Sequence, residues 1–262
     1  MKTITGVFAS VPDAHRAFAE LRSIGIPEDR LTMLSPSGAG EQKTEIPTST
    51  TEQPGMGKTI GALLGGATGL SAGPLLVAAL IPGVGPITVV GLLGGAVVAA
   101  AGASVGAVVG KHSENFMTEG LPEDEIFVYE NALRKGRHVV IAMATDDAEA
   151  ARIRELLETE GAESVDAARE QWWVGLRSAE EEDYRTRGRH FADDEKFYRL
   201  GFEAALHARA RRKEYDPATP QMSSQMEEIE RTHGKQAKEP FQRGYERGRD
   251  YYRRLCDTSK AA

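Results

Sequence analysis

No aspartate, glutamate, lysine or arginine occurs between Lys58 and Lys111, although charged residues make up 27% of the whole sequence. A run of 52 uncharged residues is rare in a water-soluble domain, whose exposed faces normally carry charge. We therefore expect residues 59–110 to be buried in a membrane or in a tightly packed assembly. The chain also has one cysteine, Cys256, which excludes an internal disulfide and fits a reducing compartment.

Recognisable catalytic, metal-binding and nucleotide-binding motifs are also missing. The six histidines show no HxxxH or HExxH spacing. The segment Gly55–Thr59 ends like a phosphate-binding loop, but Glu52 stands where the first glycine of that loop belongs. Acidic residues accompany the arginines of the C-terminal region, which argues against nucleic-acid binding. We predict a non-enzymatic protein with no catalytic residues, no cofactor, no metal and no small-molecule substrate.

A Pro-rich hexapeptide, Ile81 to Pro86, divides the uncharged run into arms of residues 59–80 and 87–110. Proline interrupts helices and glycine favours turns, so the hexapeptide predicts a tight reversal of the chain. As helices, the arms would be roughly 33 and 36 Å long, enough to cross a hydrocarbon core of about 30 Å. The sequence therefore predicts an apolar helical hairpin at residues 57–112.

Small residues recur along one stripe of each predicted helix, in the pattern of a glycine zipper. Glycine costs roughly 1 kcal/mol relative to alanine in an exposed helix, so this many glycines need the compensation of closely packed helix backbones. We predict that they mediate helix packing and homo-oligomerisation, and that assemblies exceed a dimer because both arms carry such rows. The candidate residues are Gly61, Gly65, Gly69, Gly73, Gly91, Gly95, Gly102 and Gly106.

Two environments suit such a hairpin, besides a flexible Gly/Ala linker. In one, the hairpin enters the inner membrane from the cytoplasmic side, where Lys58 and Lys111 would contact anionic lipid. The first arm has few leucines, isoleucines and valines, so its insertion would be only marginally favourable. In the other, the hairpins pack inside a large, soluble, shell-like cytoplasmic assembly that could hold lipid.

Strand and helix patterns flank the uncharged run on both sides. In chain order, the predicted elements are a strand at 3–8, a helix at 12–24, a strand at 30–34, a linker at 37–56, a helix at 122–135, a strand at 138–143, a helix from 146 or 147 to 157 and a short strand at 164–166. The sequence thus predicts an α+β fold in which one domain, residues 1–36 plus 116–174, is split by the inserted hairpin.

This organisation resembles the bacterial general stress protein 17M-like family. The resemblance covers about residues 3–174, and it rests on the segments TGVFAS and GIPEDRLTMLS, on the glycine-rich stretch and on the segment from Leu121 to Asp166. It implies a ferredoxin-like fold for the split domain, a stress-linked role and no established catalytic residues.

Residues 176–262 contain an internal repeat and predict a duplicated helical module. The segment Tyr198–Ala204 aligns with Phe241–Arg247, which pairs Gly201 with Gly244. In the second copy, aromatic residues occupy one helix face and arginines the other. The arginines could contact anionic lipid headgroups, or they could form a solvated face on which Arg and Glu neighbours pair across turns. The candidate residues for lipid contact are Arg243, Arg247 and Arg254.

Overall fold

The computed structural model describes residues 1–36, 76–81, 84–91, 122, 124–186, 190–207 and 220–260. They form a mixed α+β structure that divides into two compact units. The first unit comprises Met1–Pro122 and Tyr129–Ala168, and the second comprises Glu123–Val128 and Arg169–Ala262.

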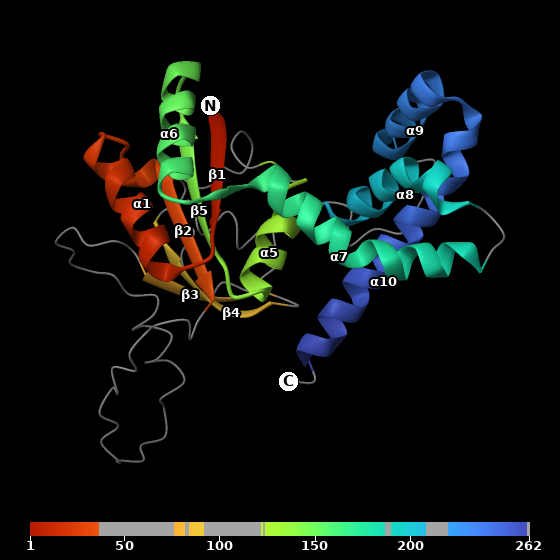
Figure 1. The fold of residues 1–262 in the computed structure, drawn as a ribbon, viewed down its shortest axis with the longest axis horizontal. Coiled ribbons are helices and arrows are strands. Elements are labelled where there is room, and N and C mark those ends of the chain that lie inside the picture. The colour runs from red at the N-terminus through yellow and green to blue at the C-terminus, as the bar shows by residue number, and fades with distance from the viewer. Residues whose placement is uncertain are drawn as a thin grey trace, which may run out of the picture. The chain divides into compact units, whose positions relative to one another are not determined.

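A six-stranded antiparallel sheet forms the centre of the first unit (Figure 1). Its strands are β1 (Lys2–Phe8), β2 (Leu31–Pro36), β3 (Leu76–Ile81), β4 (Gly85–Val90), β5 (His138–Ala144) and β6 (Glu163–Ser164). The order across the sheet is β3-β4-β2-β5-β1-β6. Strand β5 lies between β2 and β1, and β1 lies between β5 and β6. The segments β1-α1-β2 and β5-α6-β6 therefore interleave in the sheet.

The helices of the first unit are α1 (Val11–Ser23), a 3-10 turn η1 (Glu28–Arg30), α5 (Ile126–Arg134, whose first three residues belong to the second unit) and α6 (Asp147–Thr159). Helices α1 and α6 begin within one residue of the predicted starts, whereas the helix predicted from Pro122 begins only at Ile126. The Ser10 hydroxyl accepts a hydrogen bond from the Asp13 amide at the start of α1. The Asp146 carboxylate accepts one from the Glu149 amide, 2.8 Å away, at the start of α6. These caps satisfy amides that the first helical turn leaves unpaired.

The main core of the first unit lies between one face of the sheet and the helices α1 and α6. It contains buried apolar side chains from four strands and both helices, among them Phe8, Leu21, Met33, Val140, Ile153 and Leu157. The opposite face of the sheet is also covered, because all seven residues of β5 are buried. On that face the Tyr129 hydroxyl of α5 lies 3.0 Å from the Thr5 hydroxyl.

The predicted helical hairpin is wrong in its central part, where the chain forms the strands β3 and β4. The reversal between the two arms is confirmed, because β3 and β4 pair antiparallel around residues 82–84. The prediction of helix at residues 76–80 and 87–90 is wrong. Four consecutive β-branched residues, Ile87–Val90, favour an extended strand over a helix, and β4 pairs with β2 in the sheet.

Gly91 is the one predicted zipper glycine within the described residues, and it does not lie in a helix. Its φ of +101° is left-handed, and a β-carbon there would come closer than 3.0 Å to the carbonyl oxygen of Leu31. Gly91 therefore ends β4. The predicted linker at 37–56 and the following candidate residues lie outside the described residues: Lys58, Gly61, Gly65, Gly69, Gly73, Gly95, Gly102, Gly106 and Lys111.

The second unit is helical. Its helices are α7 (Val165–Arg185, which begins in the first unit), α8 (Phe191–Leu206), α9 (Pro220–His233), the 3-10 turn η2 (Lys235–Ala237) and α10 (Lys238–Lys260). The boundary expected at residues 174–176 falls inside α7, which runs without a break from Val165 to Arg185. Within the described ranges, no helix combines the length and the apolar composition needed to cross a bilayer.

Candidate functional site

The two copies of the internal repeat cross each other through their glycines. A β-carbon built on Gly201 of α8 would come closer than 3.0 Å to the carbonyl oxygen of Phe241. A β-carbon built on Gly244 of α10 would approach the carbonyl oxygen of Tyr198 in the same way. The two contacts are equivalent under the repeat alignment. The helices therefore pack backbone against backbone about an approximate two-fold axis.

Aromatic side chains surround this crossing. Both tryptophans of the chain, Trp172 and Trp173, are buried on α7, and their rings lie 5.8 and 5.9 Å from the ring of Phe202. Tyr184 and Tyr198 meet edge to face, 5.2 Å between ring centres. Such offset and edge-on contacts add to the stabilisation that burial of the rings provides. The crossing is therefore the core of the second unit.

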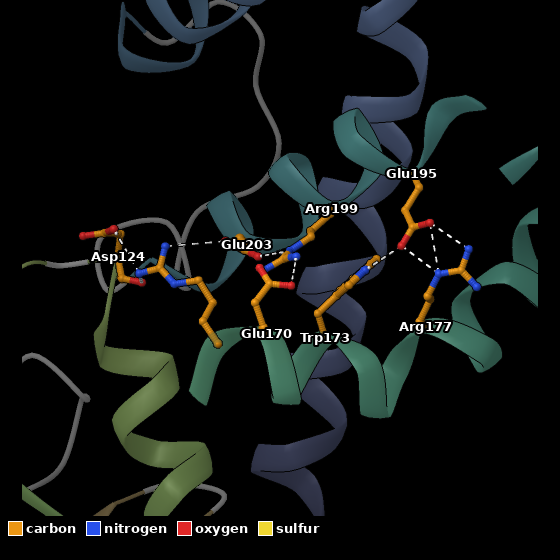
Figure 2. A network of polar contacts seen from close by, with 8 residues as sticks. Asp124, Glu170, Trp173, Arg177, Glu195, Arg199 and Glu203 are labelled. Atoms are coloured by element: carbon orange, nitrogen blue, oxygen red, sulfur yellow. Dashed lines mark hydrogen bonds and ion pairs between the residues drawn. The ribbon is translucent and has the colours of Figure 1, made fainter. Parts of the chain in front are cut away.

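A row of charged side chains connects α7 and α8 beside this core (Figure 2). Glu195 accepts hydrogen bonds from the Trp173 indole nitrogen at 2.9 Å and from two nitrogens of Arg177, each at 2.8 Å. The Arg177 guanidinium and the indole together hold the pKa of the Glu195 carboxyl below its usual range. The carboxylate thus stays charged and joins the two helices.

Arg199 continues the row in Figure 2. Its guanidinium donates to Glu203 at 2.6 Å and pairs with Glu170 at 2.7 Å, and it lies 5.6 Å from the ring centre of Trp173. The hydrogen bond from Arg199 lowers the pKa of Glu170. Further along, Arg169 pairs with Asp124 at 3.3 Å, and no hydrogen bond from a described residue reaches its buried Nε.

An open groove of about 530 Å³ follows this row along α8. Its lining residues are Arg169, Ala192, Glu195, Lys196, Arg199, Leu200 and Glu203. Both arginines in the groove already pair with carboxylates of the same unit, while Leu200 is 43% exposed. Among the described residues, the lining includes no serine, cysteine or histidine, and Glu195 and Glu203 accept from Arg177 and Arg199.

A second polar cluster is buried between α7, α8 and α10. The Glu180 carboxylate, 3% exposed as a residue, accepts hydrogen bonds from the Tyr198 hydroxyl and from Arg247, each at 2.8 Å. Burial raises the pKa of Tyr198 far above its usual range, and the adjacent Glu180 charge adds to this shift. Tyr198 is therefore a neutral donor. Arg247 balances the buried charge of Glu180.

The three arginines predicted to meet lipid have different environments. Arg243 pairs with Glu239 at 2.6 Å and lies 5.4 Å from the ring centre of Tyr184. Arg247 pairs with buried Glu180, and Arg254 is exposed. Arg243 fits the alternative in which Arg and Glu pair across one helical turn, because Glu239 precedes it by one turn on α10. Arg247 instead pairs with Glu180 on another helix, α7. The structure does not gather the three on one solvated face.

Sequence reasoning missed Glu180, Arg177 and Arg199 as the residues that join the helices. Glu180 stands in the run Glu180–Asp183, whose composition is typical of a solvated surface, so composition alone hides its burial. The repeat alignment was the informative feature, because the glycines it pairs are those that meet in the crossing.

Comparisons with protein-family models, with curated proteins and with solved structures gave no match for this chain. Within the part of the chain that the structure describes, no group of three or more His, Cys, Asp or Glu side chains is arranged to hold a metal ion.

Proposed function

We propose that this chain is a non-enzymatic structural protein that assembles into homo-oligomers through its uncharged segment, residues 59–110. The observation that carries the proposal is the position of β3 and β4 in the middle of this segment. Pairing of β4 with β2 attaches the segment to the sheet of the first unit. The uncharged residues on either side, 59–75 and 92–110, are thereby tied to a charged, folded domain.

Energetics support self-association. Residues 59–75 and 92–110 carry no charge and repeat glycine and alanine at four-residue spacing, which lets helix backbones approach closely. Burial of apolar surface against other copies would offset the cost of ordering so many glycines. The charged side chains of the α7–α8 row are used within the second unit, which accords with a structural role.

The attachment to the sheet favours a protein assembly over a hairpin that crosses a bilayer. A hairpin that crosses a bilayer and turns at residues 81–86 would carry this turn away from the domain. Here Ile87 of the same segment pairs with Pro36 of β2. The proposal is therefore an assembly whose uncharged segments pack together, and association with a membrane surface is the alternative.

The first unit fits this role as a rigid carrier. The order β2-β5-β1-β6, with the connections β1-α1-β2 and β5-α6-β6, supports the inference of a ferredoxin-like domain. The resemblance of residues 3–174 to the general stress protein 17M-like family supports a stress-linked setting. Strands β3 and β4 extend the sheet beyond β2 and bring the uncharged segment to its edge.

Light scattering of the purified full chain tests the assembly. We expect the wild-type protein to be larger than a dimer, and Gly65→Leu and Gly69→Leu each to lower the mass of the assembly. Gly175→Leu is the matched control, since Gly175 is exposed on α7 and no atom of the described residues lies within 4 Å of its β-position. A monomeric wild type, or equal masses for all variants, would refute the proposal.

Membrane fractionation separates the two settings. An alkaline wash releases a protein assembly and peripheral proteins from membranes, whereas an inserted segment stays in the pellet. Release of the chain together with a large particle mass supports the proposed assembly. Retention in the pellet would instead support the membrane alternative.

A further inference from the structure

The two edges of the sheet differ in how they are protected. At one edge, β6 is two residues long, and Glu163 in it pairs with Arg137 at 2.5 Å. At the other edge, β3 is six residues long, with the sequence LVAALI. Short strands and charged side chains prevent edges from pairing with other chains. The β6 edge has both features, and the β3 edge has neither.

Strand β3 has the properties of a strand that pairs. In an antiparallel sheet, every second residue of an edge strand directs its N–H and C=O groups outward. About three of the six β3 residues therefore present such groups on the side away from β4. Among the described residues, no strand occupies that side. The sequence of β3 contains no charge, proline or glycine that would oppose another strand.

We propose that β3 pairs antiparallel with β3 of a second copy of this chain, joining two sheets into one of twelve strands. A two-fold axis perpendicular to the sheet relates identical strands in this antiparallel manner, and it closes the interface on itself. An identical strand fits this edge, because two copies of LVAALI place no like charges opposite each other. This inference rests on the proposed self-assembly and names one interface within it.

The two-fold symmetry predicts that a disulfide between the two copies can form at one position of β3. In a symmetric antiparallel pair, one residue lies opposite itself, with the two α-carbons about 4.5–5.5 Å apart. That distance permits a disulfide. Single cysteines placed along Val77–Leu80 in a Cys256→Ala background would find this residue. Val174→Cys in the same background is the control, because Val174 is 68% exposed on α7.

We expect mild oxidation to give covalent dimers of one of the β3 variants in a yield several-fold above that of Val174→Cys. If light scattering shows oligomers but no β3 position exceeds the control, the β3 interface is refuted while the proposed assembly stands. If the chain is monomeric and no position cross-links, both are refuted.

Hydrogen exchange of the unmodified protein gives a second test that needs no substitution. On assembly, about three amides of β3 should gain protection, because only the outward N–H groups acquire new partners. The β6 amides should not change. Equal exchange of β3 before and after dilution to the dissociated form would overturn the inference.

Discussion

Gly201 and Gly244 meet reciprocally, so that each occupies a position where a β-carbon would collide with the carbonyl oxygen three residues before the other glycine. This reciprocity follows from the sequence repeat, which aligns the two glycines and their aromatic neighbours. Two helices can approach this closely only where both lack side chains. The second unit is thus a pair of repeated helices held by one shared contact.

Gly244→Ala should destabilise the second unit, although alanine is the better helix former. The new methyl group would meet backbone atoms of α8, which cannot move aside as a flexible side chain can, and the overpacking should cost about 1–3 kcal/mol or more. Because both tryptophans of the chain lie in this unit, urea unfolding followed by tryptophan fluorescence reports on it directly.

Gly175→Ala is the control for that experiment, and the opposite sign is expected. Gly175 lies in α7 with open space around its β-position, so alanine should stabilise the helix by up to about 1 kcal/mol. Equal effects at both positions would mean that the helices do not touch at Gly244.

Arg247→Met should cost the second unit roughly 3–5 kcal/mol, because it leaves the carboxylate of Glu180 buried without a cation. Replacing both residues, as Arg247→Met with Glu180→Gln, should recover most of that loss, since no buried charge remains and the new amide oxygen can still accept from the Tyr198 hydroxyl. Arg254→Gln on the exposed end of α10 should change stability by no more than about 0.5 kcal/mol. A double variant as unstable as Arg247→Met would contradict this account. Tryptophan fluorescence during unfolding again supplies the measurement.

Much of the first unit could be predicted from local sequence. A continuous apolar run indicates β5, Pro12 and Asp13 indicate the start of α1, and the capping residue Asp146 indicates the start of α6. These features act within a few residues, so they can be recognised without knowledge of the fold.

The errors arose where distant parts of the chain decide the structure. The glycine-rich pattern predicts helix through Val90, but pairing of β4 with β2 makes this part a strand. Glu180 is buried because Tyr198 and Arg247 reach it from other helices, and nothing in its own neighbourhood reports this. Tertiary contacts override local pattern at both places.

Glu149 should make the first unit sensitive to acid. Its carboxylate accepts hydrogen bonds from Arg30 at 2.7 Å and from the Thr145 amide at 2.6 Å, and these lower its pKa to about 2. The ordinary value of 4.5 applies to the unfolded chain, which therefore binds the proton first. The stabilisation by Glu149 is present above pH 4.5 and is lost as the pH falls toward 2.

Glu149→Gln tests this expectation. It should lower the stability of the first unit at neutral pH by about 1.5–3 kcal/mol, and the difference from wild type should shrink in acid. Hydrogen exchange of β5 amides reports on this unit. Glu158→Gln, exposed on the same helix, should leave exchange unchanged, and a deficit independent of pH would refute the ionic explanation.

His138 should make the same unit sensitive to pH in a milder range. The residue is 2% exposed at the start of β5, and its Nδ1 lies 2.9 Å from the Ser35 hydroxyl. Burial lowers its pKa, and the nearby charge of His15 lowers it further. In the unfolded chain the pKa of the imidazole returns to about 6.5, so the unfolded state takes up the proton first as the pH falls.

Stability of the first unit should therefore decline as the pH drops below 6.5, by at most about 1.4 kcal/mol per pH unit for one proton. His138→Gln keeps a polar partner for Ser35 and removes the titration, so it should flatten the profile between about pH 8 and pH 5. His190→Gln, at an exposed histidine of the second unit, should leave the exchange of β5 amides at its wild-type pH dependence. If His138→Gln retains the wild-type slope, another group controls the response, because a side chain that cannot bind a proton cannot contribute to it.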